Sequence, residues 1–129
     1  MTTPHVLVLD DRLLNQKLFA RYLGSQGLRV SVASSVAEAE SVLVNDRPAL
    51  VLLEVYLRHD DGLAFVQRAR AQGGPPMVAV TARAHPAARD EALAAGCVGY
   101  LSQPVELRAL LALTQACLPY ALRSGGDAW

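Results

Sequence analysis

The chain has 129 residues, of which 52% are hydrophobic and 19% are charged, and its 12 basic residues balance its 12 acidic residues. This balance gives no electrostatic basis for binding nucleic acid or an anionic membrane. No apolar run approaches the roughly 20 residues of a membrane-spanning helix, and the first apolar run begins too close to Met1 to leave room for a signal peptide. We therefore expect a soluble cytoplasmic module.

Apolar runs that indicate strands alternate along the chain with segments of helical periodicity. The third run, residues 49–55, has no polar alternation, which is typical of a strand covered on both faces in a parallel sheet. The predicted strands are His5–Leu9, Arg29–Ala33, 49–55, 77–80 and 99–101. Five strand–helix pairs predict one doubly wound α/β domain, because right-handed crossovers join successive parallel strands.

Capping and breaking residues mark the helices between these strands. Ser34 or Ser35 caps the second helix, and Glu38 stands three residues beyond Ser35 as in a capping box. Pro86 fits the first turn of the fourth helix, which Gly96 closes. The predicted helices cover residues 14–26, the segment from Ser35 to Pro48, 62–71, 86–96 and 106–118.

Polar residues follow four of the five strands, at the edge where open α/β sheets bind ligands. Each could be an ordinary cap or turn residue. Because parallel strands bring their carboxyl ends together, the set predicts one functional site. Its members are Asp10, Asp11, Glu54, Thr81, Gln103 and Pro104.

Other ligand classes find little support in the sequence. The turn after the first strand, residues 10–13, carries two acids in place of the glycines that cradle a dinucleotide or flavin phosphate. Cys97 and Cys117 lack the paired spacing of a metal site, and the three histidines are scattered.

Residues 10–18, 79–82 and 96–102 resemble the receiver domains of two-component response regulators, and the resemblance extends from residue 6 to about 118. It implies a flavodoxin-like (βα)5 fold with strand order 2-1-3-4-5, and a role in bacterial two-component or phosphorelay signalling. Residues 1–118 would form the receiver domain, and 119–129 would be a flexible tail or the start of a linker.

The resemblance also implies roles for the residues of the site. The acid pair Asp10 and Asp11, with the acid that ends the third strand, would hold magnesium. That third acid would accept a phosphoryl group from a histidine kinase, and Thr81 would bind the group. Tyr100 would turn inward when Thr81 moves, and a lysine would precede Pro104 across a cis peptide bond.

Two positions depart from the family pattern. Glu54 replaces the acceptor aspartate, and its extra methylene moves the nucleophile by about 1.5 Å, a misplacement to which in-line transfer is sensitive. Gln103 replaces the lysine and removes a fixed cation from the reacting oxygens. We therefore expect a pseudo-receiver that is not an enzyme, has no resident cofactor and binds Mg²⁺ weakly or not at all.

Three arginines lie in loops at the same edge: Arg12, Arg58 and Arg83. Arg58 stands where the family usually has proline. Because a guanidinium can bind a carboxylate through two hydrogen bonds, we predict that at least one arginine neutralises the pocket. Arg58 is the first candidate, with Glu54 or Asp10 as its partner.

The favoured hypothesis is a phosphorylation-independent protein-interaction module. Its partner, such as a histidine kinase or a downstream signalling protein, would bind the face formed by the fourth helix, the fifth strand and the fifth helix. In a second hypothesis, Glu54 imitates a phosphoaspartate by reaching toward Thr81 and holds the protein in an active-like state. A third is phosphotransfer onto Glu54, Asp60 or Asp61.

Overall fold

The computed structural model describes residues 3–83 and 85–119. Within this part of the chain, one five-stranded parallel sheet has the order β2-β1-β3-β4-β5, which confirms the predicted fold. The strands are β1 (His5–Leu9), β2 (Arg29–Ala33), β3 (Leu50–Leu53), β4 (Met77–Thr81) and β5 (Gly99–Ser102). The helices are α1 (Leu13–Ser25), α2 (Val36–Asp46), α3 (Gly62–Ala71), α4 (Ala88–Ala95) and α5 (Leu107–Cys117). Except for Pro119, the predicted tail lies outside the described residues.

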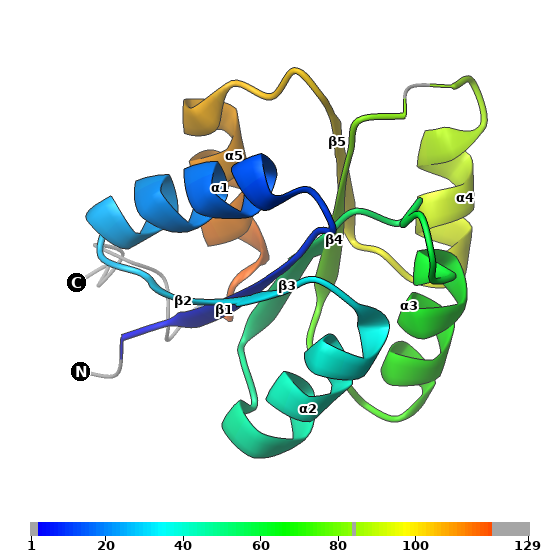
Figure 1. Cartoon of the computed structure of the whole chain (residues 1–129), viewed down its shortest axis with the longest axis horizontal. Helices are drawn as coiled ribbons and strands as arrows, with labels where there is room; N and C mark the ends of the chain where they lie inside the picture. The colour runs from blue at the N-terminus through cyan, green and yellow to red at the C-terminus, as the bar shows by residue number, and fades with distance from the viewer. Residues whose placement is uncertain (1–2, 84, 120–129) are drawn as a thin grey trace.

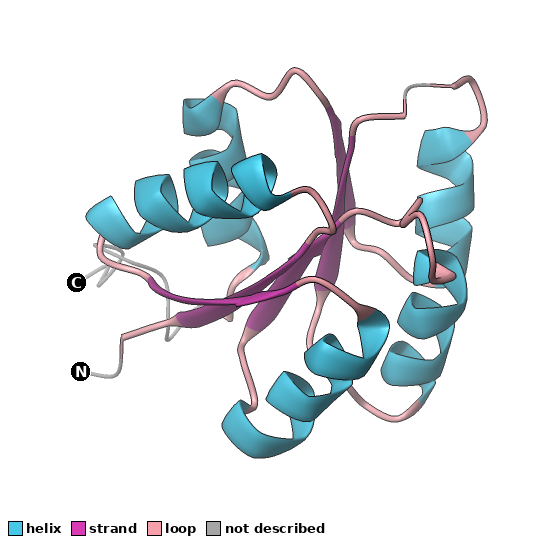
Figure 2. Cartoon of the chain, in the orientation of Figure 1, coloured by secondary structure: helices cyan, strands magenta, loops and turns pink. Residues whose placement is uncertain are grey.

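Helices cover both faces of the sheet (Figures 1 and 2). α1 and α5 lie on one face, whereas α2, α3 and α4 lie on the other. Alternate residues of each strand point to opposite faces of the sheet. In β1, Val6 and Val8 pack against the α1 and α5 side, and Leu7 and Leu9 pack against the side of α2, α3 and α4. Both faces are therefore apolar, which explains the continuous hydrophobic runs. None of the helices in the described residues is long and apolar enough to cross a membrane.

Several expected element boundaries differ from the observed ones, and two of the differences concern the loops around the site. β3 ends at Leu53, so that Glu54 lies just beyond the strand. α4 begins at Ala88, and Pro86 precedes the helix instead of forming its first turn. The reason is a tight turn in which Ala88 N donates to His85 O at 3.0 Å.

The predicted cap of α2 is confirmed, with Ser35 as the capping residue. Ser35 Oγ accepts from Glu38 N at 3.2 Å, and the Glu38 carboxylate accepts in return from Ser34 N at 2.6 Å. This exchange satisfies two amide groups at the start of the helix.

Gly62 lets the loop after β3 fold tightly against α3. A Cβ at this position would lie 2.5 Å from Val55 O, a distance that real side chains do not tolerate. Asp61 caps the same helix by accepting from Ala64 N at 3.0 Å, and Asp60 accepts from Val36 N at 2.9 Å at the start of α2. The far end of the loop that carries Glu54 is thereby fixed to the starts of both α2 and α3.

Candidate functional site at the carboxyl edge of the sheet

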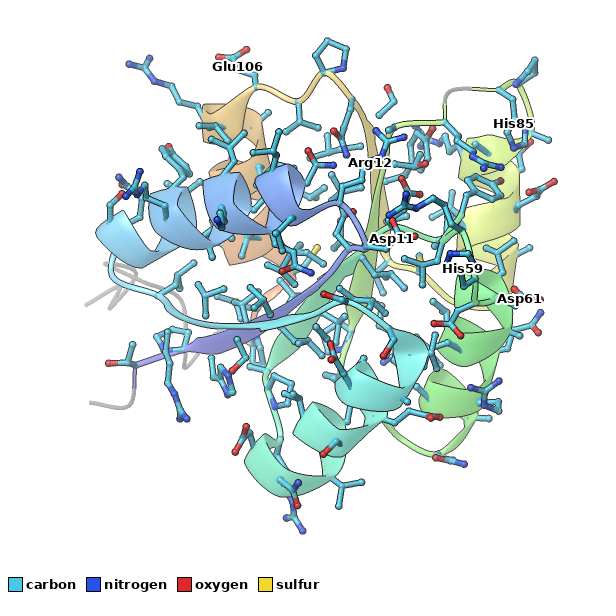
Figure 3. All side chains as sticks on the ribbon, viewed as in Figure 1. Asp11, Arg12, His59, Asp61, His85 and Glu106 are labelled. Atoms are coloured by element: carbon cyan, nitrogen blue, oxygen red, sulfur yellow. The ribbon has the colours of Figure 1, made fainter. Side chains whose placement is uncertain are left out.

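The sheet brings the predicted residues of three central strands together. The register pairs Leu9 with Leu53, so Asp10 and Glu54 follow neighbouring strands, and both residues are buried. Thr81 ends β4, and its carbonyl oxygen accepts from Gln103 N at 2.7 Å. Figure 3 shows Asp11 and Arg12 after β1, and His59 and Asp61 in the loop after β3.

Asp10 is a buried carboxylate with two donors. Its Oδ1 accepts from Arg12 N at 2.8 Å, and its Oδ2 accepts from Asn15 Nδ2 at 3.1 Å. Burial raises the pKa of Asp10, and the charges of Glu54 and Asp11 add to this effect, so that together they outweigh the two hydrogen bonds. Asn15 is a site residue that the sequence analysis missed.

Asp10→Asn should therefore stabilise the protein. Because the folded state raises the Asp10 pKa above the unfolded value of about 3.9, the charged form costs stability at neutral pH, and this cost disappears as the pH falls toward that value. An asparagine can still accept from Arg12 N, and Asn15 can rotate its amide to accept from the new NH₂ group. We expect a Tm increase of about 4 °C at pH 7, for a gain of about 1 kcal/mol.

Thermal unfolding followed by circular dichroism between pH 3.5 and pH 8 would measure this effect. Asp11→Asn is the matched control, because Arg58 lowers the pKa of Asp11 and that variant should lose stability at neutral pH. A Tm gain for Asp10→Asn that stays constant down to acid pH would show that charge is not its cause.

Glu54 bridges the loops after β3 and β4. Its Oε1 accepts from Ala82 N at 2.9 Å and its Oε2 accepts from Tyr56 N at 3.0 Å, so each carboxylate oxygen has an amide donor. The Thr81 hydroxyl oxygen accepts instead from Arg83 N at 3.0 Å. The carboxylate therefore binds the amide next to Thr81.

The expected arginine contact forms, but with a different partner. Arg58 was expected to pair with Glu54 or Asp10; instead its Nε lies 3.4 Å from Asp11 Oδ2 and its Nη2 donates to Asp11 O at 3.1 Å. The reason is the main chain, since Arg58 N itself donates to Asp11 Oδ2 at 2.7 Å and places the side chain at the rim. Glu54 and Asp10 lie beneath and already have amide donors.

Arg58 also sets the charge state of Asp11. Burial acts to raise the pKa of Asp11, but the two hydrogen bonds and the positive charge of Arg58 outweigh it and lower the pKa. The other two candidates do not neutralise the pocket with their side chains: in the described residues Arg12 and Arg83 form no ion pair. They contribute backbone amides, to Asp10 and Thr81.

A hydrogen-bonded group of Tyr56, His85 and Glu91, which no sequence pattern indicated, joins the loop after β3 to α4. The Tyr56 hydroxyl bonds the Glu91 carboxylate, and His85 Nε2 lies 2.8 Å from the same hydroxyl oxygen. Burial raises the pKa of Tyr56, and the hydrogen bond to Glu91 raises it further. His85 lies in the loop above the first turn of α4 (Figure 3).

The remaining predicted residues lie around β5. Tyr100 is half-buried and packs against the core layer of α2, α3 and α4. The Gln103–Pro104 peptide bond is cis, as the resemblance predicts. Gln103 Nε2 is buried, and within the described residues it has no hydrogen-bond partner.

Most oxygens of the three rim carboxylates already accept hydrogen bonds, which bears on their use as magnesium ligands. Mg²⁺ needs carboxylate oxygens in a nearly octahedral shell. Here both oxygens of Asp10 and of Glu54 accept hydrogen bonds, and Asp11 Oδ2 accepts from Arg58. No group of three or more His, Cys, Asp or Glu side chains in residues 3–83 and 85–119 is arranged to hold a metal.

Comparisons with known proteins show the family and agree with the fold. The family model described as response regulator receiver domain matches residues 6–115. The chain is 31% identical over 125 residues to protein PetR of Rhodobacter capsulatus, covering 95% of this chain and 53% of that protein. It is 34% identical over 114 residues to response regulator MprA of a Mycobacterium species, covering 88% of this chain and 50% of that protein. The chain thus spans about half the length of these two relatives.

Two solved structures with somewhat lower sequence identity to this chain share its fold. Chemotaxis response regulator CheY4 of Vibrio cholerae has a TM-score of 0.82 and 26% identity, covering 91% of this chain and all of that one. The BeF3-activated receiver domain of RstA from Klebsiella pneumoniae has a TM-score of 0.83 and 27% identity, covering 93% of this chain and 99% of that one.

Proposed function

Because the chain belongs to the response regulator receiver domains, we propose that it is an atypical receiver of two-component signalling that acts as a phosphorylation-independent protein-interaction module. In this proposal it is not an enzyme, has no resident cofactor and works in the cytoplasm. The position that accepts the phosphoryl group in the family serves here as a fixed structural bridge.

The bridge formed by Glu54 is the observation that carries this proposal. An aspartate at this position would end about 1.5 Å short of the present carboxylate. An oxyanion attached to it would then need donors near the present Glu54 oxygens. Those donors, the amides of Tyr56 and Ala82, are already bonded to Glu54 at 3.0 and 2.9 Å. The side chain therefore competes with any external phosphoryl group for the same amides.

The charges at the rim support the same conclusion. A phosphoryl dianion entering the site would meet Asp10, Asp11 and Glu54, with Arg58 bound to Asp11 and glutamine in place of lysine at position 103. Without a divalent metal the carboxylates repel such an anion, and the carboxylate oxygens that would bind the metal have other partners.

The partner surface in this proposal is the face of α4, β5 and α5. Leu93 on α4 and Val98 in the turn before β5 are exposed apolar side chains, with 39% and 47% of their surface accessible. A histidine kinase or a downstream signalling protein is the class of partner that the family membership suggests. Binding would not depend on a phosphodonor.

A second candidate function follows from one of the Glu54 contacts. The hydrogen bond from Ala82 N to Oε1 joins the acceptor position to the loop after β4. If this bond holds that loop as a phosphoryl group would, the protein is a permanently active-like receiver. The two candidates agree that phosphorylation is not needed and differ in which conformation the partner recognises.

Titration with beryllofluoride and Mg²⁺ tests the proposed function. This phosphoryl analogue should leave the amide resonances of Tyr56 and Ala82 unchanged, because the Glu54 carboxylate already accepts from both amides. Glu54→Asp with Gln103→Lys is the matched variant, and it should show shifts at these two amides. Saturable shifts in the wild type would contradict the proposal.

A further inference from the structure

Tyr56 connects the bridge of Glu54 to α4 through its two ends. Its backbone N donates to Glu54 Oε2 at 3.0 Å, and its hydroxyl donates to Glu91 Oε1. Glu91 belongs to the first turn of α4. One residue thus contacts the rim carboxylate with its main chain and the helix with its side chain.

His85 completes a directed chain of hydrogen bonds. A phenol has a single proton, and an ionised carboxylate can only accept, so the Tyr56 proton points to Glu91. His85 Nε2, at 2.8 Å from the phenol oxygen, must then carry a proton and donate it. The two rings also contact each other, with centroids 5.1 Å apart. Donors and acceptors therefore match from His85 through Tyr56 to Glu91.

We propose that the hydrogen-bonded chain of His85, Tyr56 and Glu91 is a latch that fixes the start of α4 to the loop after β3, and so couples residue 54 to the partner surface. The latch stands on its own contacts; its signalling meaning rests on the proposed function. It joins a loop and a helix 35 residues apart in sequence. α3 and α4 pack side by side on the same face of the sheet (Figure 1), and the latch adds a tie between the loop that leads to α3 and the first turn of α4, which restricts how α4 can move.

The alternative is that these are surface hydrogen bonds without mechanical effect, since exposed polar pairs contribute little. Two features argue against it. Tyr56 is half-buried, and its hydroxyl has two partners at once, Glu91 and His85. The ring contact with His85 also restricts both side chains before the hydrogen bonds form. Linked, preorganised hydrogen bonds to a carboxylate are stronger than an isolated exposed pair.

Tyr56→Phe removes only the hydroxyl and so tests the latch. Amide hydrogen exchange of residues 88–95 should become about fivefold faster, because the loss of a charge-assisted hydrogen bond lowers the free energy of local opening. Exchange in α1 and α5 should not change. Tyr22→Phe, a half-buried tyrosine on α1, is the matched control and should leave α4 as in the wild type.

Glu91→Ala removes the other end of the same bond, and its half-exposed side chain makes the variant tolerable if Tyr56→Phe does not fold. The double variant should exchange no faster in α4 than either single variant. The latch is overturned if α4 exchange in both single variants equals that of the wild type, or if the two effects multiply.

These outcomes are separate from those of the proposed function. A wild type that accepts a phosphoryl group, together with faster α4 exchange in Tyr56→Phe, would overturn the proposed function and keep the latch. A wild type that accepts no phosphoryl group, together with unchanged α4 exchange in both variants, would keep the proposed function and overturn the latch.

Discussion

Arg58→Ala should give the rim a magnesium affinity about fivefold above that of the wild type, which we expect to bind the ion weakly or not at all. In the wild type, Asp11 Oδ2 accepts from both the backbone N and the Nε of Arg58. Removing the guanidinium frees one side of that carboxylate and, within the described residues, leaves Asp10, Asp11 and Glu54 without an ion pair. Mutual repulsion among uncompensated carboxylates favours a divalent ion, and one lost exposed ion pair of about 1 kcal/mol corresponds to the fivefold change.

Calorimetry and amide shifts during a Mg²⁺ titration would measure this gain. Arg83→Ala is the matched control, because the Arg83 side chain forms no ion pair within the described residues. Arg58 would not be the residue that weakens Mg²⁺ binding if the wild type binds Mg²⁺ as tightly as Arg58→Ala, or if Arg83→Ala gives the same gain in affinity.

Glu54→Asp together with Gln103→Lys should restore phosphorylation by acetyl phosphate, and Glu54→Asp alone should restore little. The first change withdraws the carboxylate from the amides of Tyr56 and Ala82 and leaves both free for an oxyanion. The second supplies a cation at a position where the present Gln103 Nε2 is buried and, within the described residues, has no partner. One electrostatic group at a reacting oxygen contributes roughly 10²–10³ in rate, so the double variant should react at least about a hundredfold faster than Glu54→Asp.

The mass of the intact protein after incubation with acetyl phosphate and Mg²⁺ measures this restoration. Gln103→Lys alone is the control, and it should remain unmodified because the acceptor is still glutamate. If the double variant gains no phosphoryl group, the site has diverged beyond these two residues. Adding Arg58→Ala would then test whether metal binding is the missing requirement.

Sequence periodicity predicted the fold and the position of the site for a physical reason. Strands buried on both faces show as continuous apolar runs, and the residue after each run must lie at the carboxyl edge. Asp10, Glu54 and Thr81 could be placed together on that basis. The cis bond before Pro104 and the strand order were predicted from the resemblance and are confirmed.

Contacts that depend on loop conformation could not be predicted in the same way. The predicted partner of Arg58 was wrong because the backbone amide of Arg58, and not the charge of its side chain alone, directs this residue to Asp11. The amide donors of Glu54 depend on the backbone of two loops, which no residue pattern encodes. The link of Tyr56 to His85 and Glu91 joins positions 29 and 35 residues apart, beyond any helical or strand period.

The proposed function requires that Glu54, at the position of the phosphoryl acceptor, forms a structural bridge and accepts no phosphoryl group. The most direct test is to incubate the wild-type protein with acetyl phosphate and Mg²⁺ and to follow its intact mass over time. We expect an unchanged mass at every time point, because the extra methylene of Glu54 would misplace the nucleophile and both its oxygens are bonded to amides. A stable or transient gain of one phosphoryl group, lost in Glu54→Gln, would contradict it.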